Sequence, residues 1–237
     1  MSERIIGKEY YDRSDYFEGG TGHLTDLDSP FQQYRIRKVL EIHRPVAEDR
    51  VVDLGCGWGT FCFALAPAVK EIVGVDFSEK SIELCEKRLA QAPFDNVRFV
   101  CADGGDTGLP AGVWDMVLAA DLFEHLYPDD SARVFAEAFR LLAPGGRFAV
   151  WTPHRGHILE VLKNNEILLE RDISHVDYKS MARLKSYATE AGFDVERAYY
   201  AESHVPGLSL VERALQGAVP LLRRRIALLA RKPFRTL

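Results

Sequence analysis

Short apolar runs alternate along this chain with segments in which apolar residues recur every three or four positions. The runs of strand type are residues 51–54, 72–75, 97–101, 114–119, 147–151 and 226–230. The helical spacing appears at residues 31–43, 78–89 and 129–142. Because strands and helices keep alternating, the pattern predicts an α/β fold with a doubly wound parallel sheet.

Punctuating residues indicate where these elements begin and end. Ser78 is an N-cap residue ahead of the second helical segment, and Pro45 closes the first. The Pro-Gly-Gly sequence at 144–146 predicts a turn into the strand that begins at Arg147. No internal repeat or low-complexity tract interrupts the alternation, so we expect one domain with accessory segments.

A glycine-rich turn directly follows the first strand. Asp53 stands near the end of that strand, and glycines at positions 55, 57 and 59 let the backbone turn sharply and approach a ligand. The next apolar run ends at Asp76, where a carboxylate can accept hydrogen bonds from ribose hydroxyls. The spacing therefore predicts a nucleoside site at the edge of the sheet.

Two departures from the dinucleotide fingerprint narrow the choice of nucleoside. Thr60 occupies the position of the third glycine, and the charge of Asp53 would repel a pyrophosphate. No Lys-Ser/Thr pair follows the glycines, which excludes a phosphate-binding Walker loop. Asp-x-Gly-x-Gly-x-Gly with Asp76 downstream instead resembles the first two motifs of class I S-adenosylmethionine-dependent methyltransferases. A tight turn in an unrelated α/β fold is the alternative.

The resemblance implies a Rossmann-like, mostly parallel sheet of seven strands that ends in an antiparallel hairpin. It also implies S-adenosylmethionine as cofactor and S-adenosylhomocysteine as product. Asp53 would face the cationic methionine end, Asp103 would accept from the adenine amino group, and Phe77 would cover the ring. Taken singly, Asp103 could equally cap a turn and Phe77 could belong to the core. The expected cofactor residues are Asp53, Gly55, Cys56, Gly57, Asp76, Phe77, Asp103, Gly104 and Ala120.

His125 is the predicted catalytic residue. The sulfonium methyl group is already activated, so such an enzyme aligns the acceptor with the methyl group and removes a proton where the acceptor needs it. A neutral imidazole titrates near neutral pH, and His125 follows a strand expected to pass beneath the methyl group. The alternative is that Glu124-His125 begins a helical turn or braces a substrate loop.

Three further motifs resemble ubiquinone-biosynthesis-type O-methyltransferases, and the likeness covers about residues 50–200. They are Phe123-Glu124-His125-Leu126, Thr152-Pro153-His154-Arg155 and Ser174-His175-Val176-Asp177-Tyr178. The resemblance implies a helix over 180–191 and a small-molecule acceptor methylated at a hydroxyl oxygen. The residues expected to line the acceptor cleft are Tyr16, Tyr34, His154 and His175.

These motifs also suggest how the chain is divided. Residues 1–45 would be a lid or cap, and 46–237 the methyltransferase domain. The latter would carry a substrate-loop insertion around 153–180 and a helical insertion around 204–224. Carboxylates with imidazoles suit divalent cations, and Asp121, Glu124, His125 and His175 offer such a set. Ion pairs and capping explain these four as easily, so no metal is assigned.

Composition restricts the remaining partners. The chain is 47% hydrophobic and 27% charged, with a net charge of −5, which is ordinary for a globular protein. From residue 206 onward seven Arg or Lys residues stand against one Glu, and an amphipathic stretch there could contact an anionic membrane or a lipid-like substrate. We favour a covering helix, because Pro220 interrupts the stretch. The acidic remainder of the chain argues against nucleic acid.

Localisation and thiol state follow from the same survey. No apolar run reaches the ~18 residues needed to span a bilayer, and the N-terminus leads into no signal-peptide core, so a cytoplasmic protein is expected. The four cysteines lack CxxC spacing and are expected to be buried thiols. Rival functions are lipid C-methylation or cyclopropanation, a nicotinamide-binding oxidoreductase, and a noncatalytic nucleoside-binding module.

Overall fold

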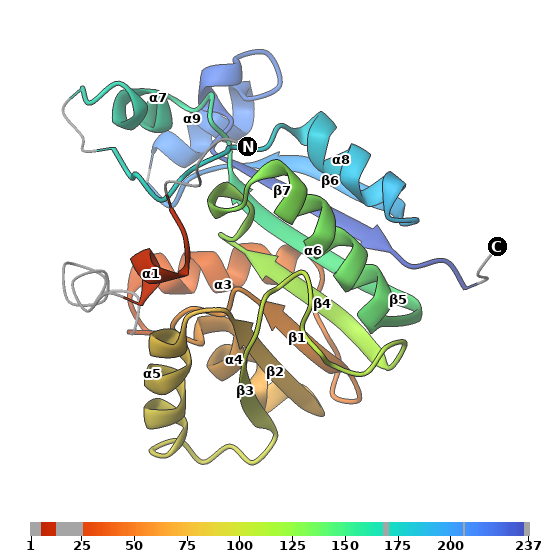
Figure 1. The fold of residues 1–237 in the computed structure, drawn as a ribbon. Coiled ribbons are helices and arrows are strands. Elements are labelled where there is room, and N and C mark those ends of the chain that lie inside the picture. Colours follow the sequence, from red (N-terminus) through yellow and green to blue (C-terminus); the bar gives the residue numbers. More distant parts are fainter. Residues whose placement is uncertain (1–5, 13–25, 168–170, 206, 235–237) are drawn as a thin grey trace.

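The computed structural model describes residues 6–12, 26–167, 171–205 and 207–234 (Figure 1). Its centre is one seven-stranded sheet with the strand order β3-β2-β1-β4-β5-β7-β6. The strands are β1 (Arg50–Leu54), β2 (Glu71–Asp76), β3 (Val97–Cys101), β4 (Trp114–Ala120), β5 (Leu142–Pro153), β6 (Asp194–Ala201) and β7 (Arg225–Arg231). This confirms the predicted seven-stranded α/β fold.

Strand direction places the ends of the central strands at one edge. The β1·β2, β1·β4, β2·β3 and β4·β5 pairs are parallel, while β7 runs antiparallel to both β5 and β6. The predicted antiparallel hairpin is thus β6–β7. Ligands of such sheets bind beyond the carboxyl ends of the parallel strands, so a site is expected at that edge.

Helices cover both faces of the sheet (Figure 1). On one face lie α3 (Pro30–Ile42), α4 (Thr60–Leu65) and α5 (Glu79–Leu89), and on the other lie α6 (Pro128–Leu141) and α8 (Met181–Glu190). Alternate strand residues feed the two cores: Val51 packs in the first and Val52 in the second. Both are fully buried, as expected for a doubly covered parallel strand.

Hydroxyl caps fix the starts of three helices. The side chain of Ser29 accepts from the amide of Gln32, and Pro30 suits the first position of α3. Ser78 caps α5 as predicted. Ser180 caps α8 in the same way. Because capping is local, the sequence placed these helices within one or two residues.

Strand β5 begins earlier than the sequence indicated. The Pro-Gly-Gly segment at 144–146 was expected to be a turn, yet it lies inside β5. Gly145 has φ +86°, which favours glycine, and its N–H donates to Lys232 O at 2.8 Å. The register of β4 and β5 shifts between Trp114 and Met116. The Pro-Gly-Gly segment is therefore an irregularity inside β5 and not a turn that precedes the strand.

Three more helices lie beyond the carboxyl ends of the parallel strands: α1 (Lys8–Tyr11), α7 (Ile158–Asn164) and α9 (Leu208–Leu215) (Figure 1). There are also three short 3-10 helices among the described residues. Phe123–His125 follows β4, Pro220–Leu222 precedes β7, and Ala66–Ala68 ends α4 just before β2. Within the expected 1–45 cap, α3 belongs to the core layer, whereas α1 lies over this edge. No helix in the described ranges is long and apolar enough to cross a membrane.

Candidate active site

The glycine turn adopts the backbone that its sequence requires. Gly55 and Gly57 have φ +70° and +50°, a left-handed conformation that favours glycine. The amides of Gly55 and Cys56 both donate to Val75 O, at 2.8 and 3.0 Å, which ties the turn to β2. A Cβ on Gly55 would lie 2.7 Å from Leu122, whereas one on Gly57 would meet nothing within 4 Å. Gly57 therefore lies on the open side of the turn.

Asp76 at the end of β2 is oriented toward this turn. Its Oδ2 accepts from Gly57 N at 2.9 Å, and its Oδ1 accepts from Ser78 N at 3.0 Å. Burial raises the pKa of Asp76, and the two amide donors oppose that rise. Each carboxylate oxygen has a second lone pair. The side chain is thus held in place and can still accept from a ligand hydroxyl.

Asp53 lies beneath the turn in a nearly dry environment. Its side chain is buried, and its Oδ2 accepts from Cys62 Sγ at 3.6 Å. Burial raises the pKa of Asp53 to about 7, although the charge of Arg35 opposes this. A cation bound nearby would favour the ionised carboxylate.

The four thiols are free, as expected, but they differ in exposure. Three of them, Cys56, Cys62 and Cys85, are buried. Cys101 is exposed, so the prediction of a buried thiol is wrong at that position. It ends β3, an edge strand of the sheet, and its side chain belongs to neither of the two core clusters.

Asp103 and Phe77 follow β3 and β2 at the same edge. Asp103 Oδ1 accepts from Gly105 N at 2.7 Å, and its Oδ2 lies 3.0 Å from Arg133, so it caps its own turn, as one alternative had it. Phe77 is 38% exposed and is not a core residue. A Cβ on Gly104 would lie 3.6 Å from Cγ2 of Val134. Ala120 is buried at the end of β4.

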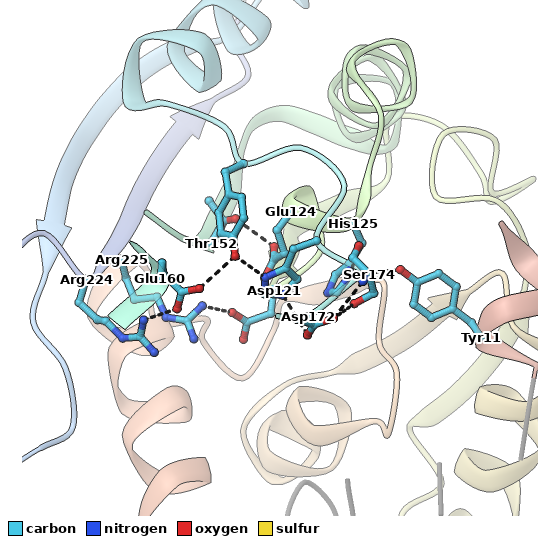
Figure 2. Close-up of polar contacts among 12 residues, drawn as sticks. Tyr11, Asp121, Glu124, His125, Thr152, Glu160, Asp172, Ser174, Arg224 and Arg225 are labelled. Atoms are coloured by element: carbon cyan, nitrogen blue, oxygen red, sulfur yellow. Dashed lines mark hydrogen bonds and ion pairs between the residues drawn. The ribbon is translucent and has the colours of Figure 1, made fainter. Parts of the chain in front are cut away.

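His125 lies in the 3-10 helix that follows β4 (Figure 2). Its Nδ1 is 3.1 Å from Ser174 O and 3.1 Å from Tyr11 Oη. A carbonyl oxygen only accepts, so Nδ1 carries the proton and Nε2 the lone pair. Burial lowers the pKa of His125, which favours the neutral ring. His125 therefore belongs to a helical turn and also contacts the loop at Ser174, as the alternative interpretation had it. Its Nε2 nevertheless keeps a lone pair that can accept a proton.

His175 lies beside His125, with 5.0 Å between ring centroids. Its Nδ1 is 2.7 Å from Tyr178 Oη, and that hydroxyl donates to Glu160 Oε2 at 3.0 Å. Glu160 is also paired with Arg224. Since the Tyr178 proton goes to the carboxylate, the hydroxyl accepts from Nδ1–H, and His175 Nε2 carries the lone pair. Burial lowers the pKa of His175 to about 4.

Asp121 and Glu124 are both carboxylates of this site, but they have different partners and opposite shifts in pKa. Asp121 has φ +55°, a strained conformation for a residue with a side chain, and it is bound between Arg35 and Arg225. Burial opposes its ionisation, but the two guanidinium groups hold the pKa of Asp121 down, at about 2. Glu124 is buried and accepts from Thr152 Oγ1 at 3.0 Å (Figure 2). Burial and the charge of Asp121 raise the pKa of Glu124.

The other predicted acceptor residues have different surroundings. Tyr34 is buried and donates to Glu202 O. His154 is half-buried with its ring 5.2 Å from that of Tyr200. Tyr16 lies outside the described residues. Of the three predicted acceptor residues that the structure describes, only His175 is placed beside His125.

Tyr11 is a site residue that sequence reasoning did not single out. Its hydroxyl contacts His125, its ring is 5.3 Å from Phe77, and its carbonyl accepts from Ser78 Oγ at 3.2 Å. Tyr11 therefore joins the base to the aromatic residue after β2. The tyrosine-rich segment from Tyr10 to Tyr16 predicted a cap, but its lack of period did not indicate which ring faces inward.

Comparison with known proteins agrees with this geometry. Residues 51–146 match a family described as a methyltransferase domain. A ubiquinone biosynthesis O-methyltransferase of Thiobacillus denitrificans is 30% identical over 169 residues, 68% of this chain and 71% of that protein. A 27-O-demethylrifamycin SV methyltransferase of Amycolatopsis mediterranei is 33% identical over 141 residues, 59% of this chain and 47% of that protein.

A solved structure extends the likeness to the whole fold. Phosphoethanolamine N-methyltransferase 2 of Haemonchus contortus, in complex with S-adenosyl-L-methionine, has a TM-score of 0.70 at 16% identity, covering 97% of this chain and 60% of that one. The chain belongs to the class I S-adenosylmethionine-dependent methyltransferases, which confirms the predicted family and cofactor. It spans about half the length of several curated relatives, namely 44%, 54% and 47% of them.

Proposed function

We propose that this protein transfers the methyl group of S-adenosylmethionine to a hydroxyl oxygen of a small molecule. The observation that carries the proposal is the position of His125. Its proton-free Nε2 lies at the same sheet edge as the glycine turn and Asp76, and Tyr11 links the two parts. O-methylation is the activity that the names of two relatives state, for ubiquinone biosynthesis and for demethylrifamycin SV.

The cofactor would lie along the ends of β1, β2 and β3. The main chain from Gly55 to Gly57 would face the methionine portion, with Cys56 between them and Ala120 closing the base of the site. Asp76, already oriented by two amides, would accept from the ribose hydroxyls. The exposed ring of Phe77 would cover one adenine face.

Adenine recognition at Asp103 has one requirement. Both carboxylate oxygens already accept a hydrogen bond, from Gly105 N and from Arg133. The adenine amino group would therefore use a second lone pair on one oxygen. The amide of Gly104 would meet the ring. At the other end of the cofactor, the sulfonium and ammonium charges would favour the ionised form of buried Asp53.

Methyl transfer would then need one proton acceptor. As the acceptor oxygen attacks the methyl carbon, the sulfur–carbon bond breaks and its electron pair stays on sulfur, giving neutral S-adenosylhomocysteine. The hydroxyl proton passes to Nε2 of His125. A general base typically contributes about 10²–10⁴-fold to such a reaction. Aligning the two reactants and excluding water supply the rest.

Small molecules are the acceptors that this edge favours. Asp53, Asp76 and Asp103 give the cofactor side an acidic character that would repel the phosphates of nucleic acid. The exposed apolar residues of α9, Leu210, Val211 and Leu215, leave membrane contact or an apolar acceptor open to test.

A screen with methyl-labelled S-adenosylmethionine tests the proposal. The acceptor panel contains phenols, sugars, amines, lipids with hydroxyl groups, and lipid alkenes supplied with bicarbonate. We expect label in an ether on a phenolic or sugar-type acceptor, lost in His125→Ala. Label only on an alkene carbon would instead establish cyclopropanation or C-methylation. Cofactor binding without transfer to any acceptor would establish a noncatalytic module.

A further inference from the structure

Three side chains of the site converge on one point. Glu124 and His125 come from the 3-10 helix after β4, and His175 comes from the segment before α8. One ligand-type atom from each lies within 4.8 Å of the others. Ligands about 2.1 Å from one ion are separated by about 3–4 Å, so side-chain movements of about 1 Å would let all three bind it.

The outer contacts of the two imidazoles match those of metal ligands. A metal-binding histidine usually donates its other N–H to a carbonyl, a carboxylate or a similar acceptor, which fixes the tautomer. His125 Nδ1 faces Ser174 O (Figure 2). His175 Nδ1 faces the Tyr178 hydroxyl, which is itself bound to Glu160. Both Nε2 atoms therefore carry lone pairs. The two imidazoles thus each keep one nitrogen with a lone pair that can bind an ion.

Charge at this point also favours a cation. The carboxylate of Glu124 is buried, and within the described residues it forms no ion pair with a lysine or arginine. Arg225, whose charge acts on Glu124, is bound to Asp121. Asp172 adds a further negative charge, with Oδ2 3.5 Å from His175 Nε2. Asp121 was one of the four candidate metal ligands in the sequence, but its carboxylate is already bound to Arg35 and Arg225.

We propose that Glu124, His125 and His175 form a binding site for one divalent first-row transition ion of the zinc type. Two imidazole nitrogens with one carboxylate oxygen select such ions over Mg²⁺ or Ca²⁺, which prefer oxygen ligands. Three protein ligands leave positions open, as in catalytic rather than structural zinc sites. The acceptor hydroxyl would occupy an open position, where the ion would lower its pKa so that it releases its proton to solvent before its oxygen attacks the methyl carbon.

A catalytic role for the ion rests on the proposed methyl transfer. Binding of the ion to the protein does not depend on that function. An ion and a substrate proton compete for the same lone pair of His125. With the ion bound, coordination activates the acceptor oxygen, and direct proton transfer to His125 is replaced. Binding is therefore measured on the protein alone, without cofactor or acceptor, and cofactor affinity is measured separately on the same samples.

The test titrates chelator-treated protein with Zn²⁺ by calorimetry and with Co²⁺ by visible absorption, which reports coordination directly. We expect one ion per chain and loss of tight binding in His175→Ala and Glu124→Gln. Tyr178→Phe removes only the outer contact of His175 and should weaken binding about 10–100-fold. His43→Ala, at the far end of α3, is the matched control and should bind as the parent does. Circular dichroism checks that each variant is folded.

Absence of binding in the parent protein overturns the proposal, as does equal binding in the parent, Glu124→Gln and Tyr178→Phe. If His175→Ala does not fold, the other two variants decide the question. S-adenosylmethionine binding that persists without any ion binding sinks the metal site and leaves the methyltransferase proposal intact. Ion binding in a protein that binds no S-adenosylmethionine does the reverse.

Discussion

The cofactor side and the acceptor side of this site hold their charges in different ways. On the cofactor side, each exposed or partly exposed carboxylate is fixed by a main-chain amide two residues away, Asp76 by Ser78 and Asp103 by Gly105, besides its longer-range contact with Gly57 or Arg133. On the acceptor side, Asp121 binds Arg35 and Arg225, which are 86 and 104 residues away. The first arrangement is local and needs a short motif, whereas the second needs the finished fold.

The family match covers the cofactor side fully and the acceptor side only in part. The matched family region, residues 51–146, contains the glycine turn, Asp76, Asp103 and His125. His175, Arg224 and Arg225 lie beyond it. A side built from distant partners can change its partners one element at a time, so we infer that acceptor preference is set there.

The largest expected effect comes from removing the base on the acceptor side. His125→Ala should lower kcat by about 10²–10⁴-fold, because Nε2 no longer takes the acceptor proton. Calorimetric affinity for S-adenosylmethionine should stay the same, since the cofactor side keeps its local contacts. An unchanged kcat would show that the reacting proton goes elsewhere.

A stability comparison tests the two kinds of ion pair. Asp121→Ala leaves two largely buried guanidinium groups without their carboxylate and should cost about 3–5 kcal/mol in the free energy of unfolding. Asp103→Ala removes an exposed pair with Arg133, 54% and 48% exposed, and should cost about 0–1 kcal/mol. Urea unfolding measures the free energy of unfolding of both variants. Similar losses of stability in Asp121→Ala and Asp103→Ala would show that the buried and the exposed ion pairs do not differ in stability.

The cofactor side is tested by Asp76→Ala. Losing the acceptor of the ribose hydroxyls should weaken S-adenosylmethionine binding by about 1.5–3 kcal/mol, measured by calorimetry. Glu83→Ala, an exposed carboxylate on α5, is the matched control and should bind normally. Equal affinity in Asp76→Ala and the parent would make the ribose assignment wrong.

A smaller effect is expected from Asp53. Its pKa of about 7 in the free protein should fall when a cationic cofactor binds, so binding releases a proton. Affinity for S-adenosylmethionine should then rise with pH by at most about tenfold per unit below pH 7 and level off above it. Asp53→Asn should flatten that profile. A flat profile in the parent protein would place the cofactor charge away from Asp53.

Local signals predicted most of the fold. Ser78 caps α5 where expected, since the cap and its amide partner are three residues apart. The glycine turn has the left-handed backbone that its spacing indicated. The start of β5 was misplaced, because main-chain hydrogen bonds to Lys232, just past β7, and the pairing of Leu142 with Trp114 extend the strand through Pro144-Gly145-Gly146 despite their turn preference.

On the acceptor side, the sequence indicated which residues would belong to the site but not how they would be arranged in space. His125 and His175 were chosen singly, yet nothing in their spacing showed that their rings would lie 5.0 Å apart. The strain at Asp121 and its two arginine partners depend on three elements meeting in space. Tyr11 reaches His125 across 114 residues, a distance over which periodicity carries no information.

A crystal structure with S-adenosylhomocysteine bound tests the central claim most directly. We predict the ribose hydroxyls within hydrogen-bond distance of the Asp76 carboxylate, and the sulfur on the side of the glycine turn that faces His125. A nucleoside bound elsewhere, or one whose ribose makes no contact with Asp76, would contradict the account.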